Sequence, residues 1–227
     1  MNTKYFFGHP YFHLNLKLNN TLIQSLSKKA ISLKKKNTGK SISNIGGFHS
    51  KIFTLIEICP KPIVKKIFNA YDNYLRLIYS NLEIINTKYI KTEAWLNINY
   101  SSNFNSAHEH TPTGSMFSGV LFVNVPSNLK HNEGCLVFED LMYPHPRNTL
   151  KFNQPIYRLP LQKSKKNFCN KFIKPIKGDL VLFPSSLFHS VSATFSKKLR
   201  ISMAINFIDP RLKLKATKFP RSKKLYK

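Results

Sequence analysis

The chain has 227 residues, of which 42% are hydrophobic. That is enough for one buried core, and we expect a single domain over residues 1–227. No segment has the roughly 18 consecutive apolar residues of a membrane-spanning helix, and the N-terminus lacks the apolar stretch of a signal peptide, so we expect a cytoplasmic protein. The three cysteines are an odd number with no CxxC spacing, so we expect neither a disulfide framework nor a thiolate zinc site.

The formal net charge is +26, from 36 Lys and Arg against 10 Asp and Glu. Lysine accounts for 30 of the basic residues, and these lysines are spread along the chain. Scattered charge without a reading motif gives weak, salt-sensitive association with nucleic acid, so we do not expect specific nucleic-acid recognition. The charge favours an anionic substrate.

The first 92 residues are predicted to form a mainly helical support region. It begins with a short alternating strand over 11–18, followed by a helix over 21–33 and a loop over 34–47. A longer helix is expected after Pro62, because apolar residues recur there at helical spacing. These residues are Ile63, Ile67, Ala70, Tyr71, Tyr74, Leu75 and Ile78.

From Glu93 the hydrophobic period changes from 3.6 to 2, which indicates strands. Over residues 94–100 one face carries Trp95, Asn97 and Asn99, and the other is apolar. Further strands are expected over 117–125, 134–139, 178–183, 189–194 and 199–207. Many short strands separated by turn residues predict a mainly β fold with N-terminal helices, a sandwich or barrel with its core over 93–208. Residues 141–172 are expected to form an inserted loop or lid, and 209–227 a basic tail.

Two histidines two residues apart, His108 and His110, form the first candidate site. On a strand, alternate residues point the same way, so both imidazoles can lie on one face while Glu109 points away. This is a spacing at which two side chains can bind one metal ion. His9, His13, His49, His131 and His145 are isolated in the sequence, and we expect surface or structural roles for them.

A second candidate site combines a turn at Gly178, a buried strand that ends at Pro184, and His189 at the start of the next strand. Arg200 follows eleven residues later, in an apolar strand where it shares a face with Ser202. An arginine in such a strand is costly to bury unpaired, so we expect it to have an anionic partner. That partner is either a ligand or an acidic side chain of the protein.

These motifs together resemble the 2-oxoglutarate and Fe(II)-dependent oxygenases, in particular a family of small members common in marine bacteria and their phages. The matching pattern is W-x-N-x-N, H-x-H, S-G-V and G-D-x-x-x-F-P-S-x-x-x-H-x-V, over about half of the chain. The resemblance implies a double-stranded β-helix, a cupin-like jelly roll. It implies that His108 and His189 bind Fe(II) and that Arg200 and Ser202 bind the far carboxylate of 2-oxoglutarate.

Position 110 departs from the family pattern, because most members have Asp or Glu there, which completes a facial triad of two histidines and one carboxylate. Three interpretations remain open. His110 binds the metal itself, a carboxylate of Glu139, Asp140 or Glu109 reaches the metal, or water takes the third position. We favour His110, because strand geometry places it beside His108. Such a centre keeps a +2 charge, which dianionic 2-oxoglutarate can balance.

Asn97 and Tyr100 are further candidates for lining the cosubstrate cavity, together with Asn99. A hydroxylase-type oxygenase acting on an unidentified substrate is the interpretation that explains both the histidines and Arg200. A three-histidine cupin dioxygenase that needs no oxo acid is the first alternative, but it leaves Arg200 and Ser202 unexplained. The second alternative is a metal-free basic jelly roll with a binding or structural role. The substrate and the oligomeric state cannot be deduced from these motifs.

Overall fold

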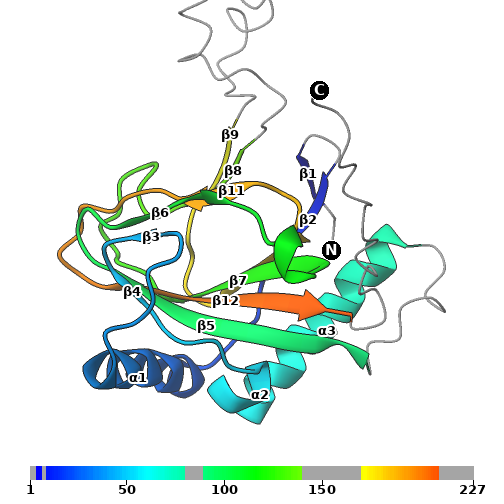
Figure 1. The fold of residues 1–227 in the computed structure, drawn as a ribbon, viewed down its shortest axis with the longest axis horizontal. Coiled ribbons are helices and arrows are strands. Elements are labelled where there is room, and N and C mark those ends of the chain that lie inside the picture. Colours follow the sequence, from blue (N-terminus) through cyan, green and yellow to red (C-terminus); the bar gives the residue numbers. More distant parts are fainter. Residues whose placement is uncertain (1–3, 7–8, 80–88, 140–169, 210–227) are drawn as a thin grey trace, which may run out of the picture.

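The computed structural model describes residues 4–6, 9–79, 89–139 and 170–209. These residues form two facing antiparallel sheets (Figure 1). The larger sheet has the strand order β1 (Lys4–Phe6), β2 (His9–Asn15), β10 (Asp179–Pro184), β7 (Phe117–Asn124), β12 (Arg200–Ile208), β5 (Lys91–Asn99) and β4 (Phe48–His49). The smaller sheet has the order β3 (Asn44–Ile45), β6 (Phe104–His108), β11 (His189–Val191), β8 (Leu136–Glu139) and β9 (Asn170–Ile173).

The chain crosses repeatedly between the two sheets. Strands β5, β7, β10 and β12 belong to the larger sheet, and β6, β8 and β11, which intervene along the chain, belong to the smaller one. This winding is that of a double-stranded β-helix, so the predicted jelly roll is confirmed. The predicted strands after Glu93 are all present, with ends that differ from the prediction by at most three residues.

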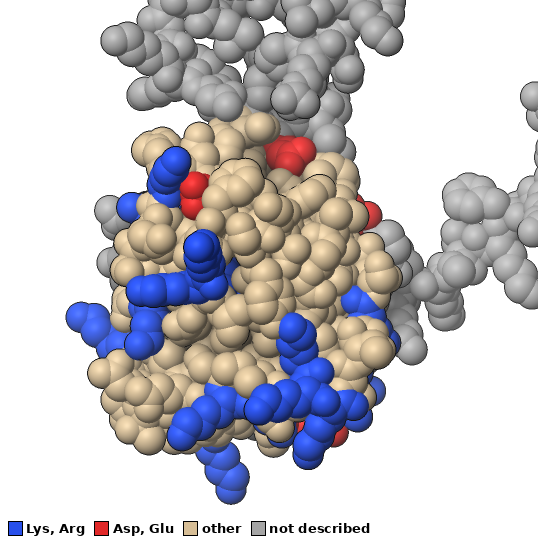
Figure 2. Space-filling model, turned by 90° about the vertical axis from the view of Figure 1, so that its left-hand side faces the viewer, with Lys and Arg blue, Asp and Glu red and all other residues tan. Residues whose placement is uncertain are grey.

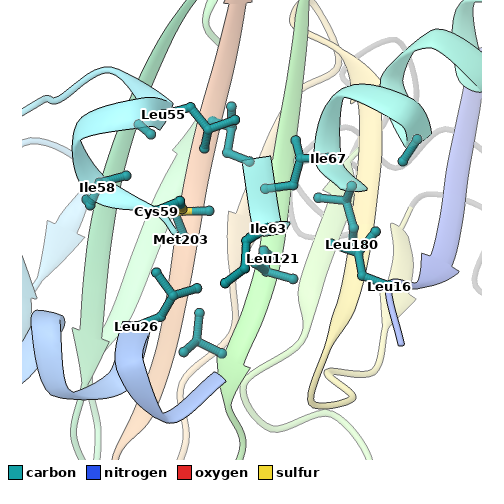
Figure 3. Packing of buried hydrophobic residues seen from close by; sticks show 14 of the residues in the cluster. Leu16, Leu26, Leu55, Ile58, Cys59, Ile63, Ile67, Leu121, Leu180 and Met203 are labelled. Carbon is teal, nitrogen blue, oxygen red and sulfur yellow. Dashed lines mark hydrogen bonds between the residues drawn. The ribbon is translucent and has the colours of Figure 1, made fainter. Parts of the chain in front are cut away.

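Helices α1 (Asn20–Lys36), α2 (Leu55–Ile58) and α3 (Lys61–Ile78) cover the outer face of the larger sheet (Figure 1). The side chain of Asn19 caps α1 by accepting a hydrogen bond from the Leu22 amide, and Thr54 and Glu57 form a capping box on α2. The apolar residues of α3 pack on the sheet as their spacing predicts, with Ile63 and Ile67 facing Leu121 (Figure 3). This layer is the main hydrophobic core.

A second hydrophobic cluster lies between the two sheets. It includes Phe122 of β7, Phe138 of β8 and Phe183 of β10, all of which are fully buried. The ring of Phe183 lies edge-on to the imidazole of His189, with 4.8 Å between the centroids. The cluster therefore forms an apolar wall beside the candidate site.

The first 92 residues also contribute strands to both sheets, in addition to the predicted helices and the predicted early strand. Strand β2 pairs with β10, β4 pairs with β5 and β3 pairs with β6, so this region extends both sheets. Strands β3 and β4 have two residues each and α2 has four, too short for a periodic signal.

Two predicted segments lie wholly or largely outside the described residues. Of the expected loop over 141–172, only residues 170–172 are described, and they belong to strand β9, not to a loop. Of the predicted tail over 209–227 only Asp209 is described. Within the described part of the chain, no helix is long and apolar enough to span a bilayer.

Candidate metal centre

Three imidazoles converge between the two sheets, those of His108, His110 and His189. His108 is the last residue of β6 and His189 the first of β11, and the two are direct partners across the paired strands. The ring centroids lie 4.5 Å apart for His108 and His189, and 5.0 Å apart for each of the other two pairs. One nitrogen atom from each ring lies within 4.8 Å of the others, a spacing at which one metal ion can be held.

His110 reaches this cluster by a different route from the predicted one. Strand β6 ends at His108, and His110 has non-extended backbone angles, with φ −118° and ψ 6°, at the start of a short 3-10 helix, Thr111–Thr113. Its amide donates to the Ser185 carbonyl, which fixes the turn beside β10. Glu109 is turned towards Thr111, and its carboxylate accepts from the amide and hydroxyl of Thr111. His110 as a metal ligand stays a prediction, and the alternation argument behind it does not apply, because His110 is not on the strand.

The Nδ1 atoms of all three histidines are already engaged. Nδ1 of His108 lies 2.7 Å from the Ser106 carbonyl, and Nδ1 of His189 lies 2.9 Å from the Leu187 carbonyl. Nδ1 of His110 lies 2.6 Å from Oδ1 of Asn206. Carbonyl oxygens only accept, so each Nδ1 carries the proton and donates. The lone pair of each ring is therefore on Nε2, which is the arrangement a metal ligand requires.

Burial keeps these imidazoles neutral. Desolvation lowers the pKa of His108, lowers that of His110 to about 4, and lowers that of His189 well below its ordinary value. Mutual repulsion between the rings acts in the same direction on His110 and His189. At neutral pH the cluster therefore presents uncharged nitrogen donors, and a divalent cation placed among them meets no protonated imidazole.

The two described carboxylates that were candidates for the third ligand form hydrogen bonds with other residues. Glu139 accepts a hydrogen bond from the Ser190 hydroxyl at 2.6 Å, and Glu109 is bound to Thr111. Asp140 lies outside the described residues. In the described part of the chain, the group of side chains that can hold a metal ion contains three histidines and no carboxylate.

Arg200 lies deep between the sheets on β12, with only 1% of its surface exposed. Its Nε donates to the Gly134 carbonyl, and its Nη1 donates to Oδ1 of Asn99 and to Oγ of Ser202. Nη2 is buried with no hydrogen-bond partner, and no described carboxylate forms an ion pair with the guanidinium. Desolvation lowers the pKa of Arg200 to about 10, so the group remains a buried cation at neutral pH. An unpaired buried cation of this kind is a site for an anion.

An inner cavity is lined by the three imidazoles and reaches β12 at Ser202 and Ala204, next to Arg200, which is not among its described lining residues. It has a volume of about 40 Å³, little more than one water molecule occupies, so a diacid can enter only if side chains move. Ser202 and Asn97 line the cavity, and Oδ1 of Asn97 is buried without a partner. Tyr100 is placed differently from the prediction: it packs on the helix side of the larger sheet and its hydroxyl contacts Lys34. It does not line the cavity, because it falls on the same face as Leu96 and Ile98, opposite Asn97.

Two residues of the site were not identified from the sequence. Asn206 orients His110, and nothing in its strand pattern distinguishes it from the other polar residues of β12. His49, expected to be isolated, is 3% exposed and stacks on Trp95, which in turn stacks on His110. Only the long-range pairing of β4 with β5 brings His49 there.

A model of the family described as "Putative 2OG-Fe(II) oxygenase" matches residues 93–206. This span includes all three histidines, Arg200 and Ser202. No curated protein matches the chain.

Solved structures of similar fold include a prolyl-4-hydroxylase from Pseudomonas putida, with 15% identity, a TM-score of 0.57, and coverage of 88% of this chain and 92% of that one. A prolyl hydroxylase from Trichoplax adhaerens, in complex with a hypoxia inducible factor peptide, has 16% identity, a TM-score of 0.54, and coverage of 88% and 84%. These similarities concern the fold.

Proposed function

This chain belongs to the 2OG-Fe(II) oxygenase family, and we propose that it is a hydroxylase whose iron is held by His108, His110 and His189. It is a non-haem enzyme with Fe(II) and 2-oxoglutarate as cofactors. One observation supports this proposed ligand set. Nδ1 of each of the three histidines donates to a carbonyl oxygen, so the lone pair of each ring is on Nε2, and the three rings form one cluster. The chain supplies no competing carboxylate from the residues described.

Arg200 and Ser202 are proposed to bind the far carboxylate of 2-oxoglutarate. Nη2 of Arg200 is buried without an acceptor, and a carboxylate would supply one. Ser202 lines the inner cavity and accepts from Nη1, so it lies between the guanidinium and the imidazoles. Asn97, on the neighbouring strand, offers an unpartnered amide oxygen to the same cavity.

The bound iron supplies oxygen activation at the cost of 2-oxoglutarate, which becomes succinate and carbon dioxide while one oxygen atom enters a C–H bond of the substrate. The residues of the chain position the reactants and exclude water. Phe183 and Leu136 provide apolar walls for the inner cavity, and Asn206 holds the His110 ring in place.

The proposal is tested by measuring oxygen uptake and succinate formation by the Fe(II)-loaded protein with and without 2-oxoglutarate. We expect succinate to form only when 2-oxoglutarate is present, with oxygen consumed in step. Oxygen uptake that is unchanged when 2-oxoglutarate is omitted would instead favour the three-histidine cupin dioxygenase. Arg200→Met, which keeps the volume of the side chain, should raise the dissociation constant of 2-oxoglutarate by about one to two decades.

A further inference from the structure

We propose that the substrate carries a cationic side chain, an alkylammonium or guanidinium group, that enters a pocket on the outer side of the three histidines. The assignment of this pocket as the substrate site rests on the proposed function. The outer pocket has a volume of about 140 Å³, room for about four or five waters and therefore for one side chain. Its described lining is Ile42, Ser43, His49, Ile52, Glu93, Trp95, His108, Glu109, His110, Thr113 and Asn206.

The outer pocket and the inner cavity meet at the imidazoles, because His108 and His110 line both. Along β12, Ser202 lines the inner cavity and Asn206 lines the outer pocket, while Arg200 lies at the far end of the strand. Arg200 and Asn206 are six positions apart along this extended strand, about 20 Å. A group in the outer pocket would therefore contact the metal centre from the side opposite the proposed cosubstrate site.

The charge of the outer pocket is opposite to that of the protein. Two of the chain's 10 acidic residues line it, and none of the 36 basic residues is among its described lining residues. Glu93 forms no hydrogen bond or ion pair with any described residue, so its carboxylate is available to a ligand. Glu109 is held by Thr111, which fixes a second carboxylate at the same pocket.

His49 adds a buried acceptor to these carboxylates. It is 3% exposed, and its Nδ1 lies 2.7 Å from the Ser50 carbonyl and so donates the ring proton. Nε2 has no hydrogen-bond partner among the described residues, and it is left as an acceptor. Burial lowers the pKa of His49, which keeps the ring neutral. The free carboxylate of Glu93 and Nε2 of His49 therefore both accept hydrogen bonds, and an N–H donor satisfies them.

Trp95 lies beside two imidazoles of the pocket. Its ring stacks on His49 and on His110, with centroid distances of 5.4 Å and 5.6 Å. The carboxylates of Glu93 and Glu109 line the same pocket as this ring.

The net charge of +26 favours an anionic substrate at long range, but the local arrangement opposes one. Exposed lysines beyond about 8 Å are screened at physiological ionic strength. Lys40, whose charge acts on His49, does not line the pocket, whereas Glu93 and Glu109 do. An anionic group there would meet two like charges, and a cationic group would meet two opposite ones. We therefore infer that the negative charge of the pocket, and not the positive net charge of the chain, determines which substrate binds.

The test uses the fluorescence of Trp95, the only tryptophan in the chain, in protein loaded with Zn(II) and 2-oxoglutarate. The probes are Nα-acetyl-lysine N-methylamide and Nα-acetyl-arginine N-methylamide, with the norleucine compound as the neutral match and the glutamate compound as the anionic one. Free lysine and arginine are titrated in parallel. They show whether the cationic group of the substrate belongs to a free amino acid or to a residue of a peptide. We expect saturable changes with the cationic probes and none with the neutral or anionic probes.

Glu93→Gln should weaken binding of the tighter cationic probe by about tenfold, as loss of one charge-assisted contact predicts. Asp72→Asn removes the same charge from α3, where Asp72 pairs with Arg76, and should leave binding unchanged. Both variants keep the size of the side chain, and their thermal unfolding checks that they are folded.

Equal affinity for the lysine and norleucine probes, or tighter binding of the glutamate probe, would overturn the cation specificity. So would a Glu93→Gln affinity equal to that of the wild type. Titrations of Zn(II) and 2-oxoglutarate on the same samples report the proposed function separately. If those ligands bind as expected while the probes are not distinguished, only the substrate class is wrong.

Discussion

Asn206 determines the orientation of the His110 ring. Its Oδ1 accepts from Nδ1 of His110 and from the Ser118 hydroxyl at 3.1 Å, so the acceptor is itself held in place. Asn206→Leu removes the acceptor and should weaken Mn(II) binding by about 10- to 100-fold, the usual effect of losing a group that supports a ligand. Calorimetric titration measures it. Asn206→Asp keeps the acceptor and should bind at least as tightly as the wild type; an equal loss in both variants would contradict this role.

The lowered histidine pKa values make the metal-free protein sensitive to acid. His110 has a pKa of about 4 in the folded state against an ordinary 6.5, so below pH 6.5 the unfolded chain binds a proton that the folded chain does not. The stabilisation is complete above pH 6.5 and is lost as the pH falls towards 4. Through His110 alone, the free energy of unfolding decreases by up to about 3 kcal/mol as the pH falls from above 6.5 to below 4.

Urea unfolding of the metal-free protein at pH 7.5 and at pH 4.5 measures this loss. His110→Gln removes the group and should show a smaller difference between the two pH values than the wild type. An identical difference in both proteins would show that His110 does not titrate as its burial requires.

The sequence predicted the strands that carry the candidate residues better than it predicted how His110 is placed. The strand pattern predicted where His108, His189 and Arg200 lie, and the resemblance to the oxygenase family supplied their roles, which stay predictions. His110 was chosen by strand alternation, yet it lies in a turn after the strand has ended. The supporting roles of Asn206 and His49 depend on pairing between segments distant in the chain, which no local pattern encodes.

On helix α3, two buried tyrosines differ in how their hydroxyls are satisfied. The hydroxyl of Tyr74 donates to the Pro10 carbonyl at 2.8 Å, whereas that of Tyr71 is buried with no partner. Tyr71→Phe should therefore leave the free energy of unfolding unchanged or raise it by about 1 kcal/mol, and Tyr74→Phe should lower it by about 1 kcal/mol. Chemical denaturation distinguishes them. Equal effects of both substitutions would mean that the two hydroxyls have equivalent environments.

Helices and strands in which hydrophobic residues recur at a regular spacing were predictable from the sequence. Short strands that form only through pairing with distant segments were not. Strands β5, β7, β10 and β12 have one face under the helices and one towards the second sheet, and helix α3 has a single apolar stripe. Strands β3 and β4 form because they pair with β6 and β5, which lie much later in the chain. The extent of α1 was underestimated at both ends, because Lys34, Lys35 and Lys36 continue the helix without an apolar signal.

At the scale of the whole molecule, positive charge and the candidate site are separated. Lysine and arginine gather on the lower part of one face, where α1 lies (Figures 1 and 2). The exposed lysines of α1 are Lys28, Lys29, Lys34, Lys35 and Lys36. The proposed metal ligands lie on the other side of the larger sheet, so contacts with polyanions through α1 need not involve them.

Replacing the five α1 lysines by glutamine should lower the salt concentration at which the protein elutes from heparin, since fewer counterions are exchanged. The same variant should bind Mn(II) and 2-oxoglutarate as the wild type does. A loss of metal or cosubstrate affinity in this variant would contradict the separation of the two surfaces.

Calorimetric titration of Mn(II) into wild type, His108→Ala, His110→Ala, His189→Ala and Glu139→Gln tests the central claim most directly. We expect each histidine variant to lose at least about a hundredfold in affinity, and Glu139→Gln to match the wild type. Wild-type affinity in His110→Ala, or a large loss in Glu139→Gln, would contradict a metal centre built from three imidazoles.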